Sequence, residues 1–327
     1  MKLEQQLLPH ADLAPLYDKA VWVYVYQTFD GTPEDMRAEH IAMRFGVTSW
    51  PQLVLADPVA LKALRHVGRS AAAFQTAFAA VELPTRTQQQ KTVAASALMA
   101  ADRRAVELFA LKDGKATAAI DLATQTLFGD AKARSHDIVV RTRAAQILAA
   151  RKPALLVEHA AVLLKTPSDP FRYLICQALG KAGATAAAPH LEALVRDPQP
   201  SLNPNVVRIR AVQALATCGR VESIAVVAPY ATSGVYFNGL TGVAIDTLAR
   251  LAARLPETQA RVAQLLRAGY PVPPSEPRES KMGMRKHRAA TALARRIHKA
   301  TGDPRSFPAS YDEAARTRLM QTPEELK

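Results

Sequence analysis

The chain has 327 residues, enough for two domains or for one long array of repeats. Hydrophobic residues make up 49% and charged residues 22%, a balance that excludes an intrinsically disordered chain. The formal net charge is +13, and no apolar run reaches the length of about 18 residues that a membrane-spanning helix needs.

The charge is distributed unevenly along the chain. Residues 1–82 contain seven basic and nine acidic residues, so the positive excess lies entirely in the remainder. Such a basic segment favours a nucleic acid, a membrane surface or an acidic protein as partner, or it is simply a solvated, Arg-rich helical surface. Alanine is abundant and aromatic residues are only 6%, a composition typical of closely packed helices, so we expect a mostly α fold.

The N-terminal stretch MKLEQQLLPHADL is polar, begins like a helix and contains no signal peptide. The default expectation is therefore a cytoplasmic protein. An extracytoplasmic location is the alternative if a signal peptide lies upstream of this sequence.

The first eighty residues predict a mixed α/β module. The run VWVYVY at 21–26 favours a strand covered on both faces. A helix follows, with Thr32 as its N-cap and Gly46 at its end. Residues 52–56 predict a second strand, LKALRHVGR a shorter one, and SAAAFQTAFAAV a closing helix capped by Ser70.

The segments RFGVTSWPQLVLADP and LRHVGRSAAAFQTAF resemble the C-terminal half of a thioredoxin-fold domain. In that family the proline before the strand is cis and lies beside the redox site, so the resemblance implies a cis peptide bond between Trp50 and Pro51. The family's CxxC and its first two strands are missing here. The only cysteines, Cys176 and Cys218, lie in apolar helical patterns typical of buried thiols. The chain therefore either starts inside a longer oxidoreductase or carries a redox-inactive half-fold.

The rest of the chain predicts a helical array. ELPTRTQQQK supplies a polar linker at 83–91, and helices follow from residue 92. Five segments align without gaps: VRTRAAQILAAR, FRYLICQALGKAG, VRIRAVQALATCG, LTGVAIDTLARLA and RKHRAATALARRI. They share one leucine position, occupied by Leu148, Leu179, Leu215, Leu248 and Leu293. Partner helices lie between them, so each unit is a helical pair of about thirty to forty residues.

SDPFRYLICQALGKAG and NPNVVRIRAVQALATCG resemble the second part of HEAT repeats, and the resemblance covers residues 135–300. It implies an α-α superhelical solenoid at 92–302 with a C-terminal capping segment at 303–327, after the incomplete thioredoxin-like α/β module at 1–82. One helical pair cannot bury both its apolar faces, so neighbouring pairs stack into a continuous core.

Basic residues dominate the candidate sites. Seven positions before the shared leucine the chain carries Arg141, Arg172, Arg208 and Lys286. One interpretation is a basic stripe that binds an acidic partner or the phosphate backbone of a nucleic acid. The other is a structural ladder of the kind that the HEAT resemblance implies, in which each arginine pairs with an aspartate or a carbonyl between units. The most basic window, 278–305, has nine basic and two acidic residues. Its basic patch comprises Arg285, Lys286, Arg288, Arg295, Arg296 and Lys299.

The sequence contains no phosphate-binding loop, no nucleophile elbow and no histidine pair at metal-ligand spacing, so no cofactor and no metal is expected. Three hypotheses follow. The first is a non-catalytic scaffold that binds a protein, with an acidic protein among the candidate partners, and that carries a redox-dead thioredoxin-like module. The second is a truncated thiol-disulfide oxidoreductase whose CxxC lies upstream of Met1, and the third is a basic solenoid that binds nucleic acid. The first is preferred, because no catalytic constellation is found.

Overall fold

The structure of the chain is a computed structural model, in which the chain folds into two compact units. The first unit is Met1–Lys152 with Ser168–Leu174, and the second is Pro153–Pro167 with Ile175–Lys327. The expected strand at 21–26 and the Trp50–Pro51 turn lie outside the described residues. The described residues are 11–14, 33–47, 53–57, 62–67, 70–81, 87–111, 117–130, 135, 137–198, 204–233, 239–322 and 324–325.

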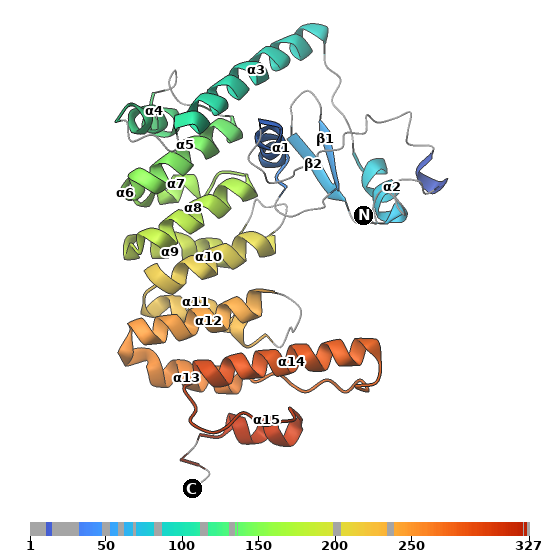
Figure 1. Ribbon diagram of the computed structural model, residues 1–327, viewed down its shortest axis with the longest axis vertical. Coiled ribbons are helices and arrows are strands. Elements are labelled where there is room, and N and C mark those ends of the chain that lie inside the picture. The colour runs from blue at the N-terminus through green and yellow to red at the C-terminus, as the bar shows by residue number, and fades with distance from the viewer. Residues whose placement is uncertain are drawn as a thin grey trace. The chain divides into compact units, whose positions relative to one another are not determined.

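The first unit begins with a small α/β portion (Figure 1). Its elements are α1 (Pro33–Arg44), β1 (Leu53–Asp57), β2 (Lys62–Val67) and α2 (Ala71–Ala79). Strands β1 and β2 pair antiparallel, with Leu53 opposite Val67. Helix α1 is followed by Gly46 at φ +66°, a left-handed conformation that glycine adopts without strain. The Ser70 hydroxyl accepts a hydrogen bond from the N–H of Ala73 at 3.2 Å, which confirms the predicted cap of α2.

A small apolar core holds α2 against the hairpin. Val67 of β2 packs with Phe74 and Ala77 of α2 and with Leu13, and all four are buried. Within the described residues the sheet has two strands, so a complete thioredoxin-like module is not shown. What the structure supports is a short hairpin with one helix packed on it.

The helical part of the first unit starts earlier than expected. Helix α3 (Gln88–Leu111) begins at Gln88, inside the segment predicted as a linker, because the run of glutamines and lysine favours helix. Helices α4 (Thr117–Phe128) and α5 (Ile138–Arg151) follow, and the three helices pack on one another. The predicted boundary of the solenoid at residue 92 remains a prediction.

Helix α1 is held to α5 by ionic contacts. The Arg143 guanidinium, with a side chain only 3% exposed, lies 2.7 Å from a Glu39 carboxylate oxygen. Arg44 lies 3.2 Å from the carboxylate of Asp137, which also caps α5 by accepting the N–H of Val139 and of Val140. The α/β portion and the first helices of the array are therefore parts of one compact unit.

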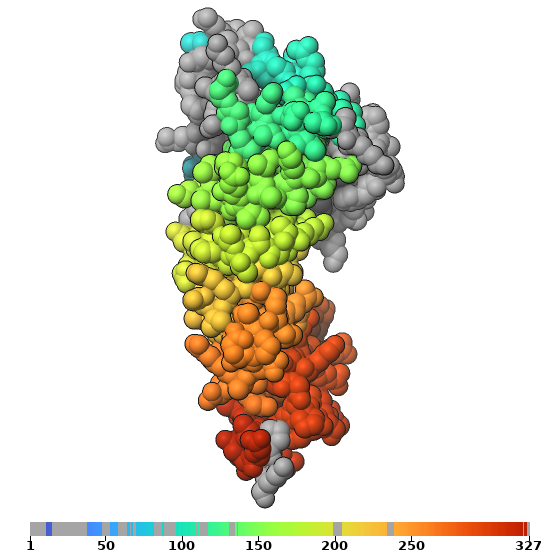
Figure 2. Space-filling model, turned by 90° about the vertical axis from the view of Figure 1, so that its left-hand side faces the viewer, coloured from blue at the N-terminus to red at the C-terminus, as the bar shows by residue number. Residues whose placement is uncertain are grey.

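The second unit is built of helices arranged in two layers. Its helices follow one another in chain order toward red in the ribbon (Figure 1), and the same order of colours runs along the space-filling view (Figure 2). Helices α10, α12 and α14 pack successively in one layer, and α9, α11 and α13 pack successively in the other. Helix α8 crosses the boundary between the units, and α15 packs on α13. The bounds are α6 (Pro153–Glu158), α7 (Ala160–Leu163), α8 (Asp169–Ala182), α9 (Ala188–Arg196), α10 (Pro204–Cys218), α11 (Val221–Ala231), α12 (Gly239–Arg254), α13 (Gln259–Ala268), α14 (Lys281–Ala300) and α15 (Glu313–Met320).

The shared leucine position is buried in both units. Leu148, Leu179, Leu215, Leu248 and Leu293 are all buried. Small residues bring neighbouring helices close together: a Cβ added to Gly180 of α8 would lie 3.0 Å from the Cα of Ala214 in α10. Close packing of this kind explains why the array is rich in alanine and poor in aromatic residues.

Candidate functional site

The recurring basic positions have partners inside the fold. Arg172 is completely buried and donates from Nη2 to the Asp169 carboxylate at 2.6 Å in the first turn of α8. Arg172 is therefore not part of an exposed basic stripe. A buried, paired arginine is typical of a structural role.

The other recurring positions also contact nearby groups. The Arg141 guanidinium carbon lies 5.1 Å from the ring centroid of Phe171. Arg208 of α10 donates from Nε to the carbonyl oxygen of Val195 in α9 at 2.8 Å, and its guanidinium carbon lies 5.4 Å from the Tyr230 ring. Lys286 forms an ion pair with Glu276. Of these contacts, the hydrogen bond from Arg208 to the Val195 carbonyl joins neighbouring helices as a structural ladder would. Arg172 pairs within its own helix, and Arg141 lies near an aromatic ring. We keep the ladder as a proposal for these four positions.

A buried polar network that the sequence did not predict joins α9 to the start of α11. The Glu192 carboxylate, 3% exposed, accepts a hydrogen bond from the Ser223 hydroxyl at 2.6 Å and contacts Arg220 at 3.2 Å. Burial by itself raises the pKa of Glu192, but the hydrogen bonds from Arg220 and Ser223 outweigh it and leave that pKa below its ordinary value. No short motif announces this network, because its members are 28 to 31 positions apart in the sequence.

The predicted basic patch lies on α14. This helix follows a Pro-rich loop at residues 270–280, which connects it to α13. Ser280 caps this helix by accepting the N–H of Gly283 at 2.9 Å. Within the described part of the chain, no ion pair involves Arg285, Arg288 or Lys299. The patch residues Arg285, Arg288, Arg295, Arg296 and Lys299 are all exposed.

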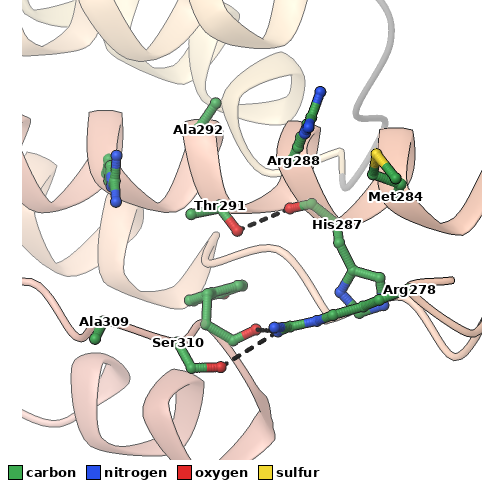
Figure 3. A pocket seen from close by; sticks show the side chains of 10 residues that line it. Arg278, Met284, His287, Arg288, Thr291, Ala292, Ala309 and Ser310 are labelled. Atoms are coloured by element: carbon green, nitrogen blue, oxygen red, sulfur yellow. Dashed lines mark hydrogen bonds between the residues drawn. The ribbon is translucent and has the colours of Figure 1, made fainter.

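A cavity of about 340 Å³ lies between α14 and the C-terminal segment (Figure 3). Figure 3 shows Met284, Arg288 and Ala292 on α14 above it and Ala309 and Ser310 on the segment below. Along α14 the lining residues recur at helical spacing, which places them on one stripe of the helix. The full lining is Arg278, Met284, His287, Arg288, Thr291, Ala292, Arg295, Ala309, Ser310 and Tyr311.

The cations of the cavity are held in different ways. Arg278 donates to the Ser310 hydroxyl at 3.3 Å and to the Tyr311 carbonyl at 3.4 Å, so it ties the Pro-rich loop to the C-terminal segment. The guanidinium carbon of Arg295 lies 5.3 Å from the Phe307 ring centroid. Arg288 extends from α14 on the side away from Arg278 (Figure 3). No aspartate or glutamate lines this cavity.

Hydrogen bonds join the C-terminal segment to the rest of the second unit and also hold the segment together internally. The buried Tyr311 donates its hydroxyl to the carbonyl of Pro271. Arg305 donates to Asp303 at 2.9 Å and to the carbonyl of Arg318 at 2.8 Å. The Arg305 guanidinium lowers the pKa of Asp303 below its ordinary value. The lower wall of the cavity is therefore part of the folded unit.

The described residues offer little for covalent or metal chemistry. Cys176 and Cys218 are buried and form no disulfide, and burial raises the pKa of the Cys218 thiol to about 11, so this thiol stays protonated at neutral pH. Within the described ranges, no three His, Cys, Asp or Glu side chains are grouped to hold a metal ion. The helices found there are too short or too polar to cross a membrane.

Comparison with known proteins agrees with the helical architecture. A family model described as HEAT repeats matches residues 127–216, from the end of α4 to α10. The searches of curated proteins and of solved structures found no match. Leu148, Leu179 and Leu215 lie inside the matched range, whereas Leu248 and Leu293 continue the same buried position beyond it. The match and the helical pairs support a HEAT-like solenoid, and HEAT repeats fit a protein-interaction scaffold.

Proposed function

We propose that this chain is a non-catalytic scaffold whose HEAT-like helices bind a protein partner, and that the basic face of α14 is the main contact surface. The observation that carries the proposal is the group of exposed cations Arg285, Arg288 and Lys299 on one helix, with no ion pair to any other described residue. Like charges kept together without carboxylate partners favour an acidic partner.

The recurring Arg141, Arg172 and Arg208 support the fold in this proposal. Each already contacts an aspartate, a carbonyl oxygen or an aromatic ring near it. The partner is therefore expected to contact α14 and not a row of these arginines. A redox-inactive role of the N-terminal portion belongs to the same proposal, because dithiol exchange needs two accessible thiols and the sequence of residues 1–82 has none.

The experiment compares the full chain with a charge-reversal variant in affinity capture from cell extract. The test variant combines Arg285→Glu, Arg288→Glu and Lys299→Glu. The control variant reverses three exposed cations on α8, α13 and the turn after α7, namely Lys181→Glu, Arg261→Glu and Lys165→Glu. We expect proteins that the wild type and the control retain to be lost by the test variant, with unchanged circular dichroism.

Three results would count against the proposal. If the test variant retains the same proteins as the wild type, α14 is not the contact surface. If nuclease treatment releases the captured material, the chain binds nucleic acid, and the third hypothesis replaces the first. If the control variant loses the proteins as fully as the test variant, the binding depends on net charge alone.

A further inference from the structure

We propose that the cavity between α14 and the C-terminal segment binds an acidic peptide of the partner. Carboxylates of the peptide would contact the arginines of the cavity, and an apolar side chain of the peptide would contact its apolar lining residues. This inference rests on the protein-binding function proposed above and assigns the segment of the partner that is recognised. The cavity is lined by three arginines and by no carboxylate. Arginine binds carboxylates through two parallel hydrogen bonds, which gives direction as well as charge.

The spacing of the cations suits an extended peptide. Arg288 and Arg295 are seven residues apart on α14, which corresponds to about 10 Å along a helix. An extended peptide covers about 3.3 Å per residue, so the backbone positions of the two arginines are separated by the length of about three peptide residues. Two carboxylates within a stretch of three to four residues can therefore reach both arginines.

The remaining lining residues favour a peptide over a single-stranded nucleic acid. Met284 and Ala292 on α14 and Ala309 on the C-terminal segment add apolar surface to the lining, and Met284 is 42% exposed. Sites for single-stranded nucleic acid without sequence preference commonly stack bases on exposed aromatic rings. Here Tyr311 is only 2% exposed, and the ring of Phe307 is covered by Arg295 and contacts His298 at 5.6 Å between centroids. The cavity thus offers charge and small apolar surface.

The cavity is also preformed. Arg278 is positioned by Ser310 and the Tyr311 carbonyl, and Thr291 donates to the carbonyl of His287 at 2.8 Å. Side chains that are already ordered lose little conformational entropy when a ligand binds. A short acidic peptide can therefore bind with measurable affinity although it covers a small area.

The test measures fluorescence anisotropy of a labelled octapeptide of glutamates with one central leucine, titrated with the full chain at low salt. Arg288→Gln removes a lining cation that makes no ion pair within the described residues, and Ala309→Glu places a carboxylate in the cavity at an exposed position. The matched control is Lys281→Gln, which changes the charge of the same helix equally, but Lys281 is exposed, does not line the cavity and is not part of the basic patch.

We expect Arg288→Gln and Ala309→Glu each to weaken binding about 5–10-fold, the size of one lost charge-assisted contact, and Lys281→Gln to weaken it less than about 2-fold. The peptide in which every glutamate is glutamine should not bind. A duplex DNA of random sequence should bind more weakly than the acidic peptide.

The assignment is overturned if the glutamine peptide binds as tightly as the glutamate peptide, if Lys281→Gln weakens binding as much as Arg288→Gln, or if duplex DNA binds more tightly than the peptide. Absence of acidic-peptide binding at low salt overturns it as well. These failures are distinct from failure of the scaffold proposal. If captured proteins still depend on α14 while the cavity variants leave peptide binding unchanged, protein binding stands and only the cavity assignment falls.

Discussion

Replacement of Glu192 by glutamine should destabilise the second unit, because it removes a buried charge that is hydrogen-bonded to Ser223 and Arg220. The carboxylate accepts the Ser223 hydroxyl at 2.6 Å and contacts Arg220 at 3.2 Å. A glutamine side chain has the same shape but only one acceptor oxygen, and its amide NH₂ would face a donor. One of the two partners therefore loses its hydrogen bond.

The magnitude follows from the exposure of each partner. Ser223 is fully buried, and a hydrogen bond from a buried hydroxyl to a charged group contributes about 1.5–3 kcal/mol, of which glutamine retains part. Arg220 is 43% exposed, so water replaces much of its interaction with Glu192 and its contribution to stability is small. The buried hydrogen bond to Ser223 therefore dominates, and we predict a loss of about 2 kcal/mol in the free energy of unfolding.

The assay is urea unfolding of the full chain followed by far-UV circular dichroism, with hydrogen exchange to locate the change in α9–α11. Glu158→Gln is the matched control, because Glu158 is exposed and makes no ion pair within the described residues; its effect should stay within about 0.5 kcal/mol. A Ser223→Ala variant combined with Glu192→Gln should destabilise less than the sum of the two single variants, because both disrupt one hydrogen bond.

The effect must also depend on pH in one direction. The pKa of Glu192 in the folded chain lies below its ordinary value of 4.5, so its contribution to stability is present above that value and is lost as pH falls through the folded pKa. The difference between wild type and Glu192→Gln should therefore shrink in acid. A difference below about 0.5 kcal/mol at neutral pH, or one that does not shrink in acid, would refute the reasoning.

Three further changes test other parts of the structure. The Cys218 thiol, whose pKa burial raises to about 11, should not react with a thiol reagent in the native chain at neutral pH and should react fully in urea, as read from absorbance. Arg143→Met should reduce hydrogen-exchange protection of α1 and lower stability by about 1–2 kcal/mol, since it removes the buried contacts with that helix. Gly283→Ala should lower the melting temperature, because its Cβ would collide with the carbonyl of Pro277, whereas Gly239→Ala, which meets nothing closer than 3.8 Å, should not.

The sequence predicted those features that depend on local chemistry or on repetition. Ser70 before an apolar helical run and Gly46 after one are short-range signals, and both mark helix ends in the structure. The shared leucine position was detectable because repetition along the chain reveals a core that no single segment defines, and Leu148 and Leu248 are buried accordingly. The cis peptide bond that the thioredoxin-like resemblance implies lies at Trp50–Pro51, outside the described residues, so it stays a prediction.

The candidate site was predicted only in part, for a physical reason. The positive charge of α14 is visible in the sequence because Arg285, Arg288 and Arg295 lie within eleven residues of one another. The cavity depends on a chain reversal that brings Ser310 to Arg278 and Tyr311 to Pro271, across 32 and 40 positions. Such contacts are set by tertiary packing, which sequence periodicity does not encode.

Arg172 and Arg288 differ in whether their own helix supplies an acidic partner. Arg172 follows Asp169 by three residues on α8, so its partner is on the same helical face and can be buried with it. Arg288 has no acidic residue three or four positions away on either side, because positions 284, 285, 291 and 292 are methionine, arginine, threonine and alanine. A helix that supplies no internal counter-ion leaves its cation to solvent or to a partner. Introducing one, by Ala292→Glu, should therefore pair Arg288 within α14 and weaken acidic-peptide binding about as much as Ala309→Glu, with no loss of helical circular dichroism. Unchanged peptide binding in Ala292→Glu would contradict this account of why Arg288 is available.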